Sequence, residues 1–206
     1  MNTVICINRE HGTGGGRIGK MVAEKLGIAF FGRNLAQMAI EYGGLDHTKY
    51  EPMLKKYEES APNKFTYSLL DIGNSHVTKM APVQDIIYQL EKDVILQEAE
   101  KQNCVVIGRC GGDILTDANC RVVRVFVTAS DEYRVKYIVD HSGEEVTEKE
   151  ARKKVEFIDK HRADFFKNYT GKEWLDPASY DIVINVENLG VEESVRLLCG
   201  IFHDEY

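Results

Sequence analysis

The chain lacks the long apolar run that a membrane-spanning helix requires. Such a helix needs about 20 consecutive apolar residues, and Arg9 and Glu10 interrupt the first apolar stretch of this 206-residue sequence. The same interruption removes the apolar centre that a secretory signal peptide would need there. We therefore expect a protein that makes no contact with a membrane.

Paired cysteines and paired histidines are missing as well. The five cysteines are odd in number and contain no C-x-x-C pair, so reduced thiols and a cytoplasmic location are expected. The six histidines are scattered, which argues against a structural zinc site. A formal net charge of −7 argues against broad nucleic-acid binding. The length suits one domain over residues 1–206, as a monomer or a homodimer.

Glycine, in contrast, is concentrated near the start of the chain. An apolar run at 4–7 is followed by four glycines within five residues, and then by a helical pattern that ends at Gly27. Strand, glycine loop and helix form a phosphate-binding layout, because glycines let backbone N–H groups approach an anion and a helix N-terminus has unpaired donors. A turn that merely connects strand to helix is the structural alternative.

Two phosphate-loop templates fit this stretch in part. The dinucleotide fingerprint G-x-G-x-x-G fits at Gly14, Gly16 and Gly19. Arg33 stands where that fingerprint expects a ribose-binding acid, and it could accommodate a ribose phosphate instead. The Walker A template G-x-x-x-x-G-K-[ST], aligned on Gly16, keeps that glycine and places Arg17 at the lysine as a wider, bidentate cation. The first template predicts an NADP-linked reductase and the second predicts a phosphotransferase.

Short apolar runs alternate with helical patterns along the chain, which predicts a parallel sheet with helices on both faces. The strand candidates are 3–8, 28–31, 104–107, 122–127 and 181–186. Helices are expected after the caps Asn34 and Asp131, over 84–101, and from a capping box at 147–150. Roughly 70 mostly helical residues separate the second and third strands. A lobe that covers a second substrate explains this length better than a short dinucleotide-fold crossover.

Positive charge is concentrated between residues 152 and 172, which hold seven Lys or Arg and three acids. Phosphoryl transfer needs such a concentration because the charge on the transferring group must be neutralised. A solvated helix face is the alternative. Arg109 follows the third strand between glycines, where ligands bind in parallel sheets, so a phosphate contact is expected. Asp71 and Asp113 are candidate magnesium or nucleotide ligands, although ordinary helix or loop carboxylates explain them better.

Together these motifs resemble the cytidylate kinase-like family, a branch of the P-loop nucleoside and nucleotide kinases. The resemblance rests on NREHGTGGGRIG, AEKLGIAFFGRNL, VVIGRCGGDIL, HRADFFKNYTGKEW and SYDIVINVENLG, in family order. It implies a three-layer α/β/α fold with a five-stranded parallel sheet. It also implies a helical acceptor-binding insertion at about 34–102 and a lid at about 143–176.

The resemblance further implies roles for individual residues. The phosphates of ATP would be held by the loop residues Gly12, Thr13, Gly14, Gly15, Gly16 and Arg17. Arg109 and Arg134 would bind the acceptor, with Asp159 as an orienting carboxylate. Catalytic charge would come from Arg17, Lys160 and Arg162. The implied reaction is transfer of the γ-phosphate of ATP, with Mg²⁺, to CMP or dCMP.

Two positions depart from the cytidylate kinase pattern. Arg17 and Ile18 stand where a lysine and a Ser or Thr are expected, and Cys110 replaces the acid that follows the Gly-Arg pair. The sequence therefore assigns no magnesium ligand. These departures motivate two alternatives: a nucleotide-binding regulatory protein with a kinase fold and little catalysis, and a kinase of another small acceptor.

Overall fold

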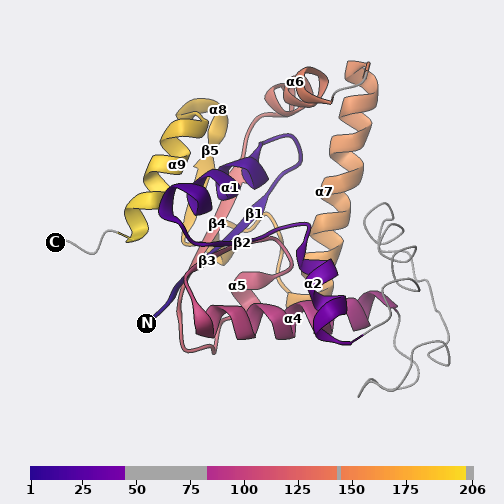
Figure 1. The fold of residues 1–206 in the computed structure, drawn as a ribbon. Helices are drawn as coiled ribbons and strands as arrows, with labels where there is room; N and C mark the ends of the chain where they lie inside the picture. Colours follow the sequence, from indigo (N-terminus) through magenta and orange to yellow (C-terminus); the bar gives the residue numbers. More distant parts are fainter. Residues whose placement is uncertain (45–82, 143–144, 203–206) are drawn as a thin grey trace.

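The computed structural model describes residues 1–44, 83–142 and 145–202, and it shows a parallel sheet between two layers of helices (Figure 1). The described residues form the strands β1 (Thr3–Arg9), β2 (Ala29–Phe31), β3 (Cys104–Ile107), β4 (Arg121–Thr128) and β5 (Ile182–Asn185). Every neighbouring pair is parallel, in the order β2-β3-β1-β4-β5. The predicted α/β fold with a five-stranded parallel sheet is confirmed.

Side-chain alternation explains why both faces of the sheet are covered. In β1, Ile5 and Ile7 point to one face while Val4 and Cys6 point to the other, and all four are buried. The first face packs against α1 (Gly15–Leu26) and α9 (Val191–Cys199). The second face packs against α2 (Leu35–Tyr42), α4 (Val83–Lys101) and α5 (Gly111–Ile114).

The strand order contradicts the dinucleotide-binding alternative. That fold places its second strand beside its first, in the order 3-2-1-4-5-6, whereas here β3 lies between β1 and β2. Gly19 of the fingerprint also has a packing role, because a Cβ there would lie 2.6 Å from Cδ1 of Ile107. The glycine pattern that suggested a reductase thus reflects helix–sheet packing at Gly19.

Helices α6 (Asp131–His141) and α7 (Glu148–Thr170) stand at the side of the sheet, and α7 extends from α6 to α4 (Figure 1). The two helices pack through Val135, Ile138, Ala151 and Val155. The predicted capping box between Thr147 and Glu150 is present at the start of α7.

The C-terminal half of α7 is anchored to the core by aromatic side chains. Phe166 and Trp174 are buried with Phe126 of β4, and the Tyr180 hydroxyl donates to the Trp174 carbonyl at 2.6 Å. These rings pack against the core and hold the loop that leads to β5 through a short helical turn (Pro177–Ser179). Helix α8 (Val186–Leu189) follows β5. The aromatic residues of this loop are therefore engaged in packing.

One predicted helix cap is wrong, and a second, Asn34, stands at the N-cap position of α2 without a capping hydrogen bond. Ser130, rather than Asp131, caps α6, with its Oγ accepting the N–H of Tyr133 at 3.2 Å. The Asn34 side chain accepts the N–H of Gly32 at 2.9 Å and makes no capping bond to α2. At α6 two neighbouring short polar side chains can compete for one backbone donor, whereas Asn34 uses its side-chain oxygen on the preceding turn. Predictions for 45–82, including a helix after Asp46 and the candidate ligand Asp71, lie outside the described residues.

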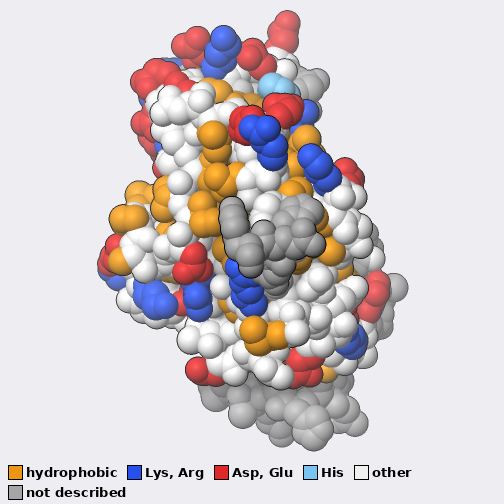
Figure 2. Space-filling view, turned by 90° about the vertical axis from the view of Figure 1, so that its left-hand side faces the viewer, with side chains coloured by type: hydrophobic (Ala, Val, Ile, Leu, Met, Phe, Trp, Pro, Cys, Tyr) orange, Lys and Arg blue, Asp and Glu red, His pale blue; other side chains and the backbone are white. Residues whose placement is uncertain are grey.

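The surface shows no single dominant charge on the face drawn in Figure 2, where Lys and Arg side chains lie in separate groups among acidic and uncharged ones. The five cysteines are all free thiols. Within the described ranges, no helix has both the length and the apolar character needed to cross a bilayer.

Candidate active site

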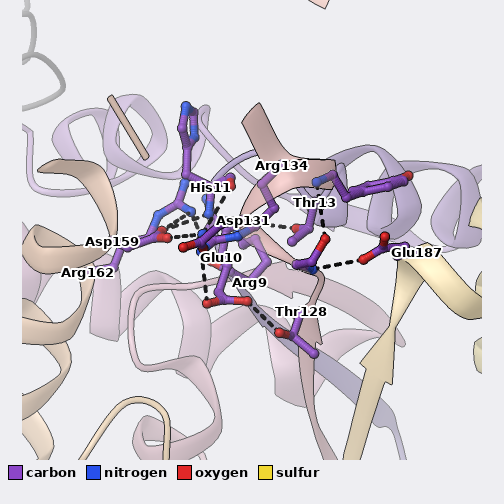
Figure 3. Close-up of polar contacts among 12 residues, drawn as sticks. Arg9, Glu10, His11, Thr13, Thr128, Asp131, Arg134, Asp159, Arg162 and Glu187 are labelled. Atoms are coloured by element: carbon purple, nitrogen blue, oxygen red, sulfur yellow. Dashed lines mark hydrogen bonds and ion pairs between the residues drawn. The ribbon is translucent and has the colours of Figure 1, made fainter. Parts of the chain in front are cut away.

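The functional residues meet at the edge of the sheet where the parallel strands end. The last residue of β1 and the loop after it supply Arg9 to Gly14, and the loops after β3 and β4 supply Arg109 and Ser130. Helix α7 passes this edge and adds Asp159 and Arg162 (Figure 3). The structure thus brings the glycine loop, the Gly-Arg pair and part of the basic stretch into one place, although they are far apart in the sequence.

Backbone conformation explains two of the loop glycines. Gly12 and Gly14 have φ values of 85° and 71°, a region that residues with a Cβ adopt rarely. Thr13 is fully buried and stabilises the turn, since its Oγ1 donates to the Glu10 carbonyl at 2.8 Å and accepts the Gly15 N–H at 3.3 Å. The loop is therefore a fixed turn ahead of α1.

Helix α1 begins at Gly15, with Gly14 as its N-cap. The Walker alignment on Gly16 implies a helix start two residues later than the one observed. Arg17 is the third residue of α1; its side chain is exposed and forms no ion pair with the part of the chain that the structure describes. Its catalytic role stays a prediction that these contacts do not support.

Arg134 is the centre of a buried ionic network. Its guanidinium pairs with Asp131 and Asp159 and lies 3.5 Å from Oε1 of Glu10, and only 6% of the residue is exposed. Burial opposes its charge, but Glu10 and Asp159 outweigh this effect and raise its pKa. Asp159 also accepts the N–H of His11 at 2.7 Å. Arg134 therefore joins the loop to α6 and α7, whereas the sequence predicts an acceptor contact.

A second group of cations near Asp159 consists of Arg9, Arg33, Arg109 and Arg162, whose charges act on one another. Arg162 Nη1 donates to the Arg9 carbonyl at 2.9 Å and lies 3.6 Å from Oδ1 of Asp159. Burial, together with the charges of Arg33 and Arg109, lowers the pKa of Arg162 to about 10 despite the opposing effect of Asp159. Burial also lowers the pKa of Arg9, and the other three arginines add to this shift. Crowded, partly desolvated cations are costly unless an anion joins them, so this cluster is suited to phosphate.

Two members of this cluster were not predicted as such from the sequence. Arg9 had no predicted role, and Arg33 had a role only in the dinucleotide alternative. The available signal for Arg9 was its position, since it is the last residue of the strand that enters the glycine loop. Side chains at such strand ends face the ligand-binding edge of a parallel sheet.

Lys160 and Arg162, predicted to act as one clamp, have different surroundings. Arg162 contacts the end of β1, whereas Lys160 is exposed and lines a hollow of about 300 Å³ beside α6 and α7. The polar residues around this hollow include Glu10, Asp131, Arg134, Arg152 and Asp159. The structure therefore places the two cations in different surroundings, and their shared catalytic role stays a prediction.

The described positions that the sequence offers for a protein-bound magnesium ion are Cys110 and Asp113. The described residues contain no group of three or more His, Cys, Asp or Glu that could hold a metal. Burial raises the pKa of the Cys110 thiol to about 12, with a further contribution from Asp113, so Cys110 does not replace the missing acid. Asp113 itself is paired with Lys172 at 2.5 Å. These residues do not form a magnesium site.

Comparisons with known proteins agree with the geometry. A model of the cytidylate kinase-like family matches residues 4–188. A solved structure of an uncharacterized protein from Eubacterium ventriosum ATCC 27560 is similar over 100% of both chains, with 24% identity and a TM-score of 0.73.

Two shikimate kinases share the fold at lower identity. The enzyme from Bacteroides thetaiotaomicron is 14% identical over 97% of each chain, with a TM-score of 0.53. The enzyme from Aquifex aeolicus vf5 is 15% identical over 96% of each chain, with a TM-score of 0.50. A search of curated proteins finds no match. Because the family model covers most of the chain, including the glycine loop and the arginine cluster, this chain belongs to the cytidylate kinase-like family.

Proposed function

We propose that this protein transfers the γ-phosphoryl group of ATP to a nucleoside monophosphate, with CMP or dCMP as the first candidates. The arginine cluster beside the glycine loop is the observation that carries this proposal, because it concentrates positive charge where a parallel sheet binds ligands. Membership in the cytidylate kinase-like family supports a nucleotide acceptor.

Positioning and charge neutralisation supply most of the catalysis in phosphoryl transfer. The free N–H groups at the start of α1 would bind donor phosphates. Arg162 would neutralise charge on the transferring group. Its guanidinium is already held in place by the hydrogen bond from Nη1 to the Arg9 carbonyl and by the carboxylate of Asp159. Arg109, held through Nε by Glu91 at 3.1 Å, would bind the acceptor phosphate together with Arg33. Magnesium would arrive as the Mg–ATP complex, and no step depends on a protein-held ion.

The acceptor-binding insertion at about 34–102 and the lid at about 143–176 belong to the same proposal. Helices α2 and α4 are the described parts of the insertion, and α4 supplies Glu91. Within the lid, buried Phe166 and Trp174 tie the C-terminal part to β4. Closure over the substrates would therefore involve the N-terminal part of α7 together with α6.

The proposal is tested by measuring ADP release from Mg–ATP with CMP, dCMP, UMP, AMP, GMP, shikimate or no acceptor. We expect release that depends on one monophosphate, with CMP or dCMP the most effective. Equal release with and without every acceptor would overturn the proposal. Release that requires a compound outside the nucleotides would retain a kinase and replace its acceptor.

One observation favours a second candidate, a nucleotide-binding protein with little catalysis. The helix after the loop begins with Gly15 and Gly16, and the first lysine along it is the exposed Lys20. A kinase loop normally places its phosphate-binding lysine at this helix start. Stabilisation of the protein by ATP in a thermal melt, without ADP release under any condition, would favour this candidate.

A further inference from the structure

The start of α1 gives a register for the phosphate loop that sequence matching does not give. The template G-x-x-x-x-G-K-[ST] ends at the opening of a helix, and α1 opens at Gly15 after the cap Gly14. In this register Gly14 keeps the second glycine of the template. Gly15 takes the place of the lysine and Arg9 takes the place of the first glycine. Compared with the template, the cationic residue and the glycine are thus interchanged: the cation is at the end of β1 and the glycine is at the start of α1.

The side chains at these two positions exclude each other. A Cβ on Gly15 would lie 2.7 Å from Cβ and 3.0 Å from Cγ of Arg9. Since real Cβ atoms do not approach other atoms so closely, a lysine at position 15 would require Arg9 to move. The aliphatic part of Arg9 therefore occupies the space in which a lysine side chain at position 15 would begin.

The charged end of Arg9 reaches the neighbouring strand. A Cβ on Gly108, the first residue after β3, would lie 2.6 Å from Nη1 of Arg9. The guanidinium thus lies between the start of α1 and the end of β3, and the absence of a side chain at Gly108 makes room for it. Arg9 forms no ion pair with any residue of 1–44, 83–142 or 145–202, and part of its surface stays accessible to solvent.

We propose that Arg9 takes over the task of the missing loop lysine and binds the β- and γ-phosphates of ATP through its guanidinium. This inference rests on the proposed function, because it assigns a ligand to the phosphate-donor site of that reaction. The planar guanidinium can donate two parallel hydrogen bonds to phosphate oxygens, which a lysine cannot do. The neighbouring charges of Arg33, Arg109 and Arg162 disfavour the cation in the free protein, and a bound triphosphate relieves that repulsion.

The test compares ATP and CMP binding by titration calorimetry in the full chain and in charge-removing variants. Arg9→Ala removes the side chain, and Arg9→Gln keeps part of the stem that packs against Gly15 and Gly108. We expect both to bind Mg–ATP about tenfold to a hundredfold more weakly, which is typical for the loss of a charge-assisted contact. CMP affinity should change less than threefold. Lys20→Ala removes one exposed charge from the same end of the protein and should bind ATP as the parent does.

Relocating the cation gives a sharper test. Gly15→Lys alone should lower the melting temperature because of the contact with Arg9, whereas Arg9→Ala combined with Gly15→Lys should regain ATP affinity over Arg9→Ala alone. Parental ATP affinity in both Arg9 variants would overturn the assignment of Arg9, while ADP release by the parent would keep the proposed function. Loss of ATP binding in these variants without ADP release by the parent would keep Arg9 and reject the kinase. A parent that binds no ATP would overturn both.

Discussion

The carboxylate of Glu91 is completely shielded from solvent and lies 3.1 Å from Nε of Arg109. Arg109 and Cys110 have φ values of 55° and 56°, which non-glycine residues adopt rarely and which cost energy unless the surroundings fix them. Helix α4 thus fixes the arginine that follows β3 through a buried ion pair. This makes Glu91 a positioning residue for the proposed acceptor site.

Replacing Glu91 with Gln should weaken acceptor binding and also lower stability. The variant removes the charge that Arg109 faces, so we expect the KM for the monophosphate to rise several-fold with little change in the KM for ATP. The free energy of unfolding should fall by about 1–3 kcal/mol because the partly exposed Arg109 loses the charge of its buried partner. Glu100→Gln, at an exposed position of the same helix, is the control for both measurements. A stability loss with unchanged KM values would make Glu91 purely structural.

Replacing Arg134 with Ala should mainly destabilise the fold. Asp159 and Glu10 would remain without the guanidinium that neutralises them, and breaking a buried pair in this way typically costs about 3–5 kcal/mol. Guanidinium chloride unfolding would measure the loss, with the exposed Arg152→Ala as a control from the same hollow. If Arg134→Ala unfolds like the parent but has a raised KM for the monophosphate, Arg134 is the acceptor contact that the sequence predicts.

Two glycines of α1 should respond in opposite ways to alanine. At Gly19 a Cβ would lie 2.6 Å from Cδ1 of Ile107 and 3.1 Å from Cδ1 of Ile7, so overpacking should cost about 1–3 kcal/mol. At Gly16 a Cβ would meet nothing within 4 Å, and alanine should stabilise the helix by up to about 1 kcal/mol. Thermal melts of the two single variants check the contrast. Equal effects would mean that the spacing between α1 and the sheet differs from the one described.

Acid should destabilise the protein partly through His11. Burial and the nearby cation Arg162 lower the pKa of His11 to about 4 from an ordinary value of 6.5. As the pH falls from 6.5 to 4, the unfolded chain gains a proton on His11 that the folded chain does not bind, so folded stability decreases over this range. The contribution should be about 1–2 kcal/mol, since partial contact with solvent reduces it.

Unfolding curves of His11→Gln at pH 7 and pH 4.5 measure this contribution. The variant should lose less stability between the two values than the parent, whereas His141→Gln, at an exposed histidine of α6, should follow the parent. A His11→Gln protein with the parent's full acid sensitivity would place the titrating group elsewhere.

Most of the fold could be predicted because buried parallel strands leave a direct signal in the sequence. Runs such as Cys104–Ile107 are continuously apolar, and all four of these residues are buried in the structure. The capping box at Thr147 and the glycine after α1 mark helix ends locally. These signals depend only on residues that are close in the sequence, so they can be recognised without knowledge of the packing.

The site was harder to predict because its contacts join distant segments. Arg9 gains its position from Gly15 and from Gly108, which lies on another strand. Glu91 follows the apolar spacing of α4, yet an acid on such a face gives no sign of its partner until Arg109 is placed beside it. The sequence predicts an acceptor contact for Arg134, and its burial follows only from the packing of α6 and α7 against the loop.

The most direct test of the proposed reaction is to follow the γ-phosphate itself. The protein would be incubated with magnesium and γ-labelled ATP in the presence of CMP, and the labelled products would be separated. We predict label in CDP, formed in equal amount with ADP, and a large reduction in Arg162→Ala. Label that remains in ATP, or that appears only in inorganic phosphate at a rate independent of CMP, would contradict phosphoryl transfer to this nucleotide.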